Sequence, residues 1–95
     1  DGIAFDAIFA TSDVGAIRAL STLNQLNIKV PAQVKVAGYD NIPLSAHVHP
    51  TLTTINQPID LAAKAMLELL KEKMAGAASR SIVLPTALVE RRSSL

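Results

Sequence analysis

"AIFATSDVGAIRALSTLNQLNIKVPAQVKVAGYD", residues 7–40, decides the fold of this chain. The continuous apolar run at 7–10 is typical of a strand that is buried on both faces. Helical spacing of apolar residues then predicts a helix from about 13 to 26, with capping oxygens at its start. The β-branched residues at 34–37, closed by Gly38, predict a second strand. A strand, a helix and a strand in about thirty residues indicate a βαβ unit with parallel strands, and so the α/β fold class.

The rest of the chain adds a second helix and several short extended segments. Pro58 stands where proline is tolerated at a helix start, and Gly76 is a natural helix stop. Between them, apolar residues recur at helical spacing as one stripe: Ile59, Ala62, Ala63, Met66, Leu69, Leu70 and Met74. We also expect a short helix or turn at 44–48, an extended segment at 51–56, and short strands at 81–85 and 87–91.

Composition limits the class of protein. The chain has 95 residues, 49% of them hydrophobic, which suits one small globular unit. Nine Lys and Arg against eight Asp and Glu give a formal charge of +1 without a basic run, so this piece alone is a poor nucleic-acid binder. The absence of cysteine excludes disulfides and thiolate chemistry and fits a cytoplasmic location. No apolar run approaches the ~20 residues of a membrane helix. Because the sequence opens on Asp1, we expect a fragment of a longer chain.

Polar side chains follow both strands of the predicted βαβ unit. Thr11, Ser12 and Asp13 come after the first strand, and Asp40 and Asn41 come after the second. In open parallel sheets, ligands bind beyond the carboxyl ends of the strands. An ionised Asp accepts hydrogen bonds through two oxygens, which suits the adjacent hydroxyls of a sugar. The pattern therefore indicates a polyol-binding site at this edge of the sheet.

Simpler roles compete with ligand binding at these positions. Ser12 or Asp13 can cap the helix, and we expect Asp13 to take that role. Asp40 can form an Asx-turn. His47 and His49 make a conceivable chelating pair, but the spacing of other residues supplies no further ligands, so we expect no metal site.

Catalysis finds little support in the sequence. No Gly-x-Ser-x-Gly elbow, P-loop or Gly-x-Gly-x-x-Gly turn is present, and no nucleophile is placed beside a base by spacing. We therefore expect neither an enzyme nor a bound cofactor. Arg91 and Arg92 end the last predicted strand, and we expect both side chains to be solvated.

Two segments together resemble a known family. "FDAIFATSDVGAIRALSTLNQLNIKVPAQVKVAGYDNIPLSAHVHPTLTTINQP" resembles the C-terminal part of the effector-binding domain in the lactose/galactose repressor (LacI/GalR) family of bacterial transcription regulators. "IVLPTALVERRSS" is similar to the closing segment of that domain. Each motif is weak alone, but together they cover essentially the whole chain in the order of the family.

The resemblance implies a periplasmic-binding-protein-like fold of type I. Such a fold has two Rossmann-like subdomains with parallel sheets and a ligand cleft between them, and this chain would supply only its C-terminal half. Residues 1–54 would belong to the C-terminal subdomain, and 55–58 would cross over. Residues 59–85 would then join the N-terminal subdomain, and 86–95 would return. One small globular unit would then be wrong in detail, because the chain would contribute to two lobes.

The resemblance also assigns residues to a ligand site and a dimer interface. Asp40 matches a ligand-binding Asp, which bonds effector hydroxyls or a purine-type ligand. Ser12 matches a ligand-contact position where many sugar-responsive members carry Asn. Asp13 matches the Asp that caps the helix near the ligand cleft. A homodimer interface would use the first helix and the loop before "PTLTT": Ile17, Leu20, Ser21, Asn24, His47 and Val48. Ordinary core packing is the alternative for the two apolar helix residues among them.

The implied function is effector sensing and dimerisation in a DNA-binding transcription regulator. A sugar or a purine-like molecule in the cleft would control operator binding by an upstream helix-turn-helix domain that is absent from this chain. The alternative is a periplasmic sugar-binding protein of a transporter or chemoreceptor, which shares the fold but acts as a monomer. The effector, the operator and the sign of regulation stay open at this stage.

Overall fold

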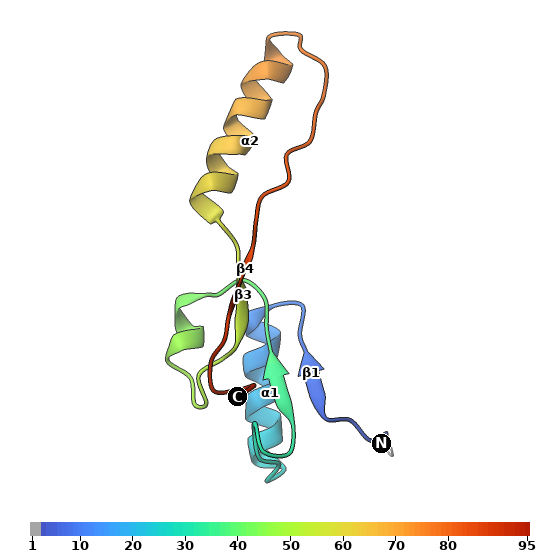
Figure 1. Cartoon of the computed structure of the whole chain (residues 1–95), viewed down its shortest axis with the longest axis vertical. Coiled ribbons are helices and arrows are strands. Elements are labelled where there is room, and N and C mark those ends of the chain that lie inside the picture. The colour runs from blue at the N-terminus through green and yellow to red at the C-terminus, as the bar shows by residue number, and fades with distance from the viewer. Residues whose placement is uncertain (1–2) are drawn as a thin grey trace. The chain divides into compact units, whose positions relative to one another are not determined.

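The computed structural model describes residues 3–95 and divides into two compact units (Figure 1). Unit 1 combines the residues up to Asn56 with Ala87–Leu95, and unit 2 is Gln57–Thr86. The elements follow in the order β1 (Ala7–Phe9), α1 (Asp13–Gln25), β2 (Lys35–Ala37), the 3-10 helix η1 (Pro43–Ala46), β3 (Thr54–Asn56), α2 (Ile59–Met74) and β4 (Ala87–Val89).

A βαβ unit forms the centre of unit 1, as the sequence predicts. β1 pairs with β2 in parallel, with Ile8 opposite Val36, and α1 connects the two strands. The helix ends at its C-cap Leu26, after which Asn27 adopts a left-handed conformation (φ 59°) that breaks the helical repeat. The core consists of residues from α1, β2 and the segment before β3: Ala16, Leu20, Leu23, Val34, Val36 and Leu52.

Residues Ala87–Leu95 form part of unit 1. β4 pairs antiparallel with β3, with Leu88 opposite Ile55. Beyond β4, Ser93 lies between two segments: its carbonyl accepts from Val36 N–H (2.9 Å), and its own N–H donates to Thr51 O (2.9 Å). The Ser93 hydroxyl donates to Val36 O (2.5 Å) and accepts from the Thr53 N–H (2.8 Å). Ser93 is fully buried, so one side chain joins two segments that are far apart in sequence.

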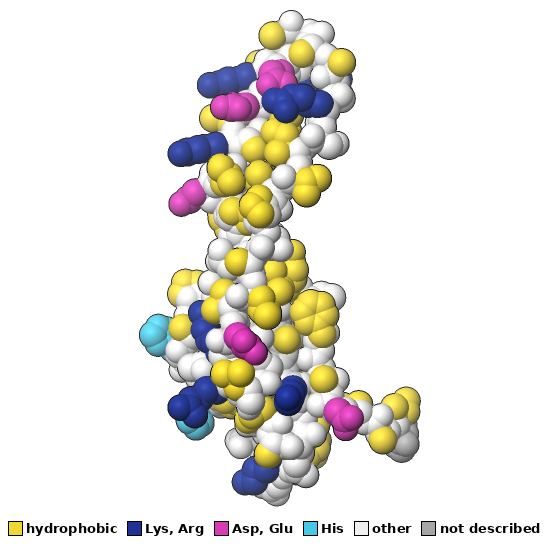
Figure 2. Space-filling view, viewed as in Figure 1, with side chains coloured by type: hydrophobic (Ala, Val, Ile, Leu, Met, Phe, Trp, Pro, Cys, Tyr) yellow, Lys and Arg dark blue, Asp and Glu magenta, His cyan; other side chains and the backbone are white. Residues whose placement is uncertain are grey.

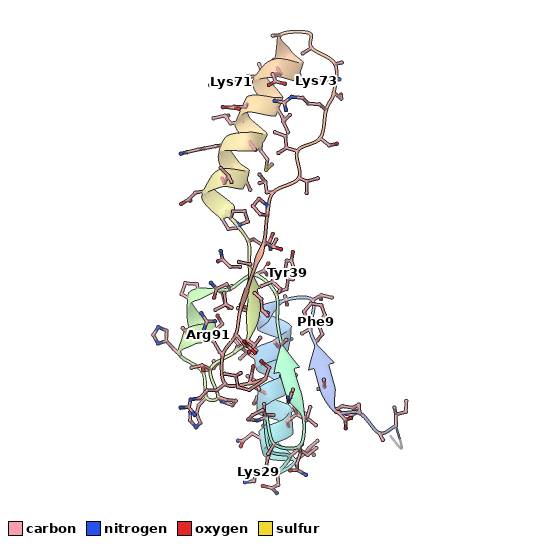
Figure 3. All side chains as sticks on the ribbon, in the orientation of Figure 1. Phe9, Lys29, Tyr39, Lys71, Lys73 and Arg91 are labelled. Carbon is pink, nitrogen blue, oxygen red and sulfur yellow. The ribbon has the colours of Figure 1, made fainter. Side chains whose placement is uncertain are left out.

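Two expectations about strands are wrong in detail. The segment 81–85 is not a strand, and 94% of the Val83 side chain is exposed. A strand requires a hydrogen-bonding neighbour, and within the described residues this segment has no partner strand. β1 is not buried on both faces, because Ala7 and Phe9 are exposed and only Ile8 between them is partly buried; Phe9, labelled in Figure 3, is 65% exposed.

Unit 2 is a helix and its return segment. α2 begins after Pro58, carries Asp60 in its first turn and Lys71 and Lys73 in its last turn, and ends before Gly76 (φ 91°), as the sequence predicts. No residue of α2 is buried, and hydrophobic side chains lie along its surface (Figure 2). The most exposed of these side chains are Ile59, Met66, Leu67, Leu70 and Met74.

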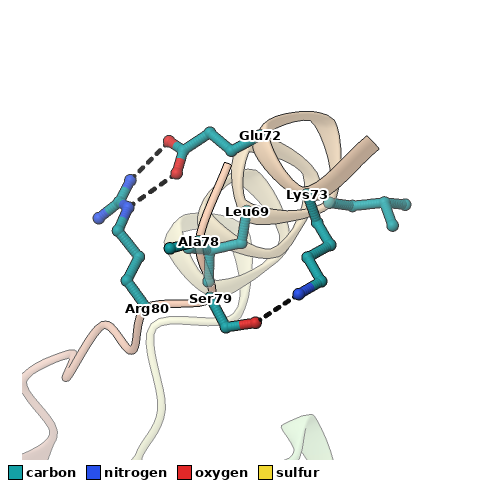
Figure 4. Close-up of a pocket in the computed structure, with 7 residues that line it drawn as sticks. Leu69, Glu72, Lys73, Ala78, Ser79 and Arg80 are labelled. Atoms are coloured by element: carbon teal, nitrogen blue, oxygen red, sulfur yellow. Dashed lines mark hydrogen bonds and ion pairs between the residues drawn. The ribbon is translucent and has the colours of Figure 1, made fainter. Parts of the chain in front are cut away.

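The return segment is fastened to the end of α2 by polar contacts. The Arg80 guanidinium donates two hydrogen bonds to the Glu72 carboxylate, at 2.8 and 2.7 Å, and Lys73 Nζ donates to Ser79 Oγ at 2.7 Å. These pairs line a pocket of about 280 Å³ (Figure 4). In the part of the chain that the structure describes, no helix is long and apolar enough to cross a membrane.

Candidate functional site

The polar residues that follow β1 and β2 come together at the carboxyl edge of the sheet. The Asp13 N–H donates to Tyr39 O at 2.9 Å, which fixes the start of α1 against the loop after β2. Gly38, just before that loop, has no room for a side chain. A Cβ there would collide with Asp13 Oδ1 and would lie 3.1 Å from both Ala16 Cβ and Leu52 Cδ2. The glycine therefore permits the close approach of helix and loop.

Ser12, and not Asp13, caps helix α1. The Ser12 hydroxyl accepts the Gly15 N–H at 3.1 Å from an extended backbone, which is the usual geometry of an N-cap. The expectation that Asp13 caps the helix is therefore wrong. Asp13 is the first helical residue, and its side chain turns inward, where Thr54 and Ile42 donate hydrogen bonds to it.

The Asp13 carboxylate joins three segments of unit 1. Its side chain is fully buried. Thr54 Oγ1 donates to Asp13 Oδ1 at 2.6 Å, and the Ile42 N–H donates to Asp13 Oδ2 at 2.9 Å. Burial of a carboxylate costs several kcal/mol unless hydrogen bonds of this kind compensate. Asp13 is therefore a structural acceptor that holds β3 and the loop after β2 to the start of α1.

Asp40 and Asn41 form a tight turn with unusual backbone angles. Their φ values are 122° and 56°. The Asn41 value lies in the left-handed region that Asn tolerates better than most residues, whereas the Asp40 value lies beyond that region and is rare for any residue with a side chain. The Asp40 N–H donates to Ile55 O at 3.0 Å, and Asp40 forms a parallel bridge with Asn56. The Asn41 N–H donates to Thr54 Oγ1 at 3.2 Å. Strand β3 therefore fixes the backbone of the half-buried Asp40, which lies at the edge of the sheet where the sequence predicts a ligand.

The expectation that the Arg91 side chain is solvated is also wrong, because this side chain is partly buried and hydrogen-bonded. Its guanidinium donates to Asn41 Oδ1 (3.0 Å), Ser45 Oγ (3.0 Å) and Leu52 O (2.9 Å). Figure 3 shows Arg91 beside η1 in unit 1. Arg92, its neighbour, is exposed as expected. The sequence carries no signal that separates these two arginines, since the acceptors of Arg91 lie 39 to 50 residues away.

Five of the six residues assigned to a dimer interface share one surface pocket. This pocket, of about 410 Å³, is lined by α1 and the segment after η1: Ile17, Leu20, Ser21, Asn24, Val48 and His49. His47, the sixth assigned residue, is exposed and does not line it. Leu20 is only 7% exposed and belongs to the core, so the core-packing alternative holds for that residue.

The described residues contain no group of three or more His, Asp or Glu side chains that could hold a metal ion. His47 and His49 therefore have no further ligand beside them within residues 3–95. The chemistry that the site offers is hydrogen bonding by a carboxylate on a fixed turn, which is a binding chemistry.

Comparisons with known proteins identify the family of this chain. Residues 4–94 match the family model of the periplasmic binding protein-like domain. The HTH-type transcriptional regulator CelR of Thermobifida fusca is 37% identical over 93% of this chain, which is 26% of CelR. The HTH-type transcriptional repressor PurR of Aliivibrio salmonicida is 41% identical over 72% of this chain, which is 20% of PurR. The chain thus spans about a quarter or less of these relatives.

Solved structures give the same result. The complex of the transcriptional regulator CelR with cellobiose superposes with a TM-score of 0.89 at 36% identity, over 94% of this chain and 28% of that one. A LacI-type regulator from Bifidobacterium animalis also gives 0.89, at 38% identity over 99% of this chain and 34% of that one. A dimeric Lac repressor gives 0.88 at 30% identity, over 99% and 35%. The chain therefore belongs to the periplasmic-binding-protein-like domain family, in the form found in transcription regulators of the LacI type.

Proposed function

We propose that this chain is the effector-sensing and dimer-forming part of a LacI-type transcription regulator, with Asp40 as a ligand contact. The observation that carries this proposal is the fixed turn at the end of β2. Its Asp40 is hydrogen-bonded through the backbone to Ile55 and bridges to Asn56. A carboxylate held at a strand end can accept hydrogen bonds from two hydroxyls at once. Ser12 has its hydroxyl committed to Gly15, so we propose it only as a secondary contact.

We propose a sugar as the effector, and a purine-like molecule as the second class. Support for a sugar comes from the relatives, because the CelR structure is a complex with cellobiose and a LacI family regulator of Enterococcus faecalis has bound ribose. Adjacent hydroxyls of a sugar match the two acceptor oxygens of one carboxylate. A ligand that binds one arrangement of the protein better than another then shifts DNA binding by that difference.

The test of the ligand site is a thermal-shift screen of the full-length protein against sugars and purines, followed by calorimetry of each hit. Asp40→Ala removes an ionised acceptor, whose hydrogen bonds contribute roughly 1.5–3 kcal/mol, so we expect about 10- to 100-fold weaker binding. Asp6→Ala is the control, because Asp6 lies before β1, at the opposite end of the strand from the site. If a hit binds Asp40→Ala as tightly as it binds the unchanged protein, the assignment of Asp40 is wrong.

We propose that the two units belong to different subdomains of the whole protein. Residues 1–54 and 86–95 would form part of the C-terminal subdomain, 55–58 would cross over, and 59–85 would enter the N-terminal subdomain. The division of the structure after Asn56 and before Ala87 supports these limits. The exposed apolar side chains of α2 support them too, since such a surface requires a cover.

We propose that α1 and the segment around Val48 form a homodimer interface. Support comes from the shared pocket and from the dimeric Lac repressor among the similar structures. Ser21→Arg with Asn24→Arg places two charges on this surface without touching the core, so we expect monomers in light-scattering chromatography. Thr22→Arg is the control, because Thr22 is exposed on α1 but does not line the pocket. A dimer that persists with both arginines would refute this interface.

DNA binding through an upstream helix-turn-helix domain, a cytoplasmic location and the absence of catalysis complete the proposal. They rest on the relatives, which are HTH-type regulators of transcription. The periplasmic sugar-binding alternative is less favoured for the same reason. Effector-dependent retardation of promoter DNA by the full-length protein separates the two, because a periplasmic binding protein has no operator.

A further inference from the structure

Arg91 makes an unusual set of contacts for a guanidinium. It is partly buried, and its three acceptors are an amide oxygen, a hydroxyl and a backbone carbonyl. The acceptors are Asn41, which follows Asp40, Ser45, which lies in η1, and Leu52, which lies shortly before β3. One side chain thus joins three points of the connection from β2 to β3. A fork of fixed geometry can do this, whereas the single ammonium of a lysine cannot.

The contact with Asn41 is the one that reaches the ligand site. The Asn41 side chain accepts from Arg91 at 3.0 Å and from Ser45 Oγ at 3.3 Å, and its amide donates to Asn56 Oδ1 at 3.0 Å. Asn41 has a positive φ of 56° next to Asp40, whose φ is 122°. Two adjacent residues in sparsely populated conformations persist only where their surroundings hold them. Arg91 supplies the charged hydrogen bond in those surroundings.

The position of Arg91 in the chain adds a second role. It follows β4, and its own backbone is fixed to Thr53, whose Oγ1 accepts from Arg91 N–H (2.8 Å) and donates to Arg91 O (3.0 Å). β3 leads out of unit 1 into unit 2, and β4 is the segment by which the chain comes back. A shift of β4 within unit 1 would therefore move the guanidinium and, through it, the turn that carries Asp40.

We propose that Arg91 is a positioning residue for the ligand site, which fixes the Asp40–Asn41 turn and links it to β4. This inference rests on the proposed function of Asp40. It makes the returning strand a determinant of ligand affinity, because Arg91 acts through the turn that carries Asp40.

Hydrogen exchange of the full-length protein tests the positioning directly, without an effector. The amides of Asp40, Asn41 and Ile42 are all hydrogen-bonded within unit 1. In Arg91→Ala and Arg91→Lys we expect these three amides to exchange at least 10-fold faster, while the amides of β2 change little. Ethylguanidinium added to Arg91→Ala should restore slow exchange, because it replaces the missing fork.

Two control variants separate positioning from general loss of stability. Arg92→Ala removes an exposed arginine next in sequence and should leave the three amides unchanged. Ser93→Ala loosens the same terminal segment through Val36 and Thr53, without touching the loop. If Arg91→Ala leaves exchange at 40–42 unchanged, or speeds it no more than Ser93→Ala does, the inference is wrong.

Measurements of ligand affinity separate the role of Arg91 from the proposed function of Asp40. With cellobiose as the probe, Arg91→Lys should weaken binding about 10-fold, and Arg92→Ala should not. Faster exchange at 40–42 together with unaltered cellobiose affinity would overturn the link to ligand affinity. If cellobiose fails to bind the unchanged protein, cellobiose is not its effector, and the exchange experiment alone decides the role of Arg91.

Discussion

Units 1 and 2 of this chain are stabilised in different ways. Unit 1 buries a set of aliphatic side chains and, beside them, the polar side chains of Asp13, Thr54 and Ser93, whose hydrogen bonds join segments far apart in sequence. α2 of unit 2 buries no residue, and its polar contacts run from the end of the helix to the following few residues. A buried polar group fixes one arrangement of its neighbours, because every alternative leaves it without a partner. We infer that the buried contacts of unit 1 fix its geometry, whereas the apolar side chains of α2 need a further protein surface to pack against.

The largest expected effect is that of Gly38→Ala. The added methyl group would collide with the Asp13 carboxylate and would crowd Ala16 and Leu52, so both the core and the hydrogen bonds of Asp13 would suffer. Overpacking and a displaced buried acceptor together are expected to cost about 3–4 kcal/mol of unfolding free energy. Urea denaturation of the full-length protein measures this. Gly15→Ala is the control, because its new methyl would have 3.4 Å to Ser12 Oγ. A helical Gly→Ala change should stabilise by roughly 0.5–1 kcal/mol.

The second prediction compares one substitution in the first turn of each helix. Asp13→Asn replaces a buried acceptor by an amide that cannot accept from both Thr54 and Ile42, so we expect a loss of about 2–3 kcal/mol. Asp60→Asn in α2 removes only the interaction of an exposed charge with the helix dipole, at most about 1 kcal/mol. Urea denaturation measures the unfolding free energy of both variants. If the two variants lose similar amounts, the proposed difference in stabilisation between the units is wrong.

Ser93→Ala should have an intermediate effect. It deprives the buried Val36 carbonyl of its donor and the Thr53 N–H of its acceptor. We expect a loss of about 2 kcal/mol in urea denaturation, since two buried groups lose a partner and the added cavity is small. Ser79→Ala in unit 2, which loses only the exposed contact with Lys73, is the matched change and should leave stability within about 0.5 kcal/mol. Equal effects of the two substitutions would contradict the description of Ser93 as a buried link.

The smallest effect concerns the Glu72–Arg80 pair. Hydrogen bonds from Arg80 lower the pKa of the Glu72 carboxyl, and Glu72 in turn raises the pKa of Arg80. A lowered carboxyl pKa stabilises above the ordinary glutamate value of about 4, and the contribution disappears as the pH falls through the lowered pKa. Arg80→Gln should therefore raise the Glu72 pKa in an NMR titration. Lys73→Gln should change it less, because Lys73 contacts Ser79. No change in Arg80→Gln would mean that the pair does not persist in solution.

Local signals explain what could be predicted from the sequence. The βαβ unit follows from apolar spacing and β-branched runs, and the limits of α2 follow from Pro58 and Gly76, all within a few residues of the elements they define. The position of Asp40 at a strand end follows from the same pattern. These features depend on residues that are close in sequence, and so they can be predicted from the sequence.

Non-local partners explain what could not be predicted. Asp13 turns away from the cap because Ile42 and Thr54 meet it from 29 and 41 residues away. Arg91 and Arg92 have the same side chain and adjacent positions, but the Arg91 side chain donates to Asn41, whereas Arg92 is exposed. The segment 81–85 has the composition of a strand, but no strand pairs with it in the part of the chain that the structure describes. The residue type determines which contacts are available to a side chain or segment. Partners that are distant in sequence determine which of these contacts form.

The hydrogen bond from Ser93 to Val36 also sets an order of events during synthesis. The two residues are 57 positions apart, and all of unit 2 lies between them. At roughly 5–20 residues per second, a ribosome completes β2 about 3–11 s before it adds Ser93. During that interval β2 lacks its neighbour on one side, and unit 1 cannot close. We expect nascent chains of this protein to stay sensitive to protease, and accessible to chaperones, until the residues after β4 have left the exit tunnel.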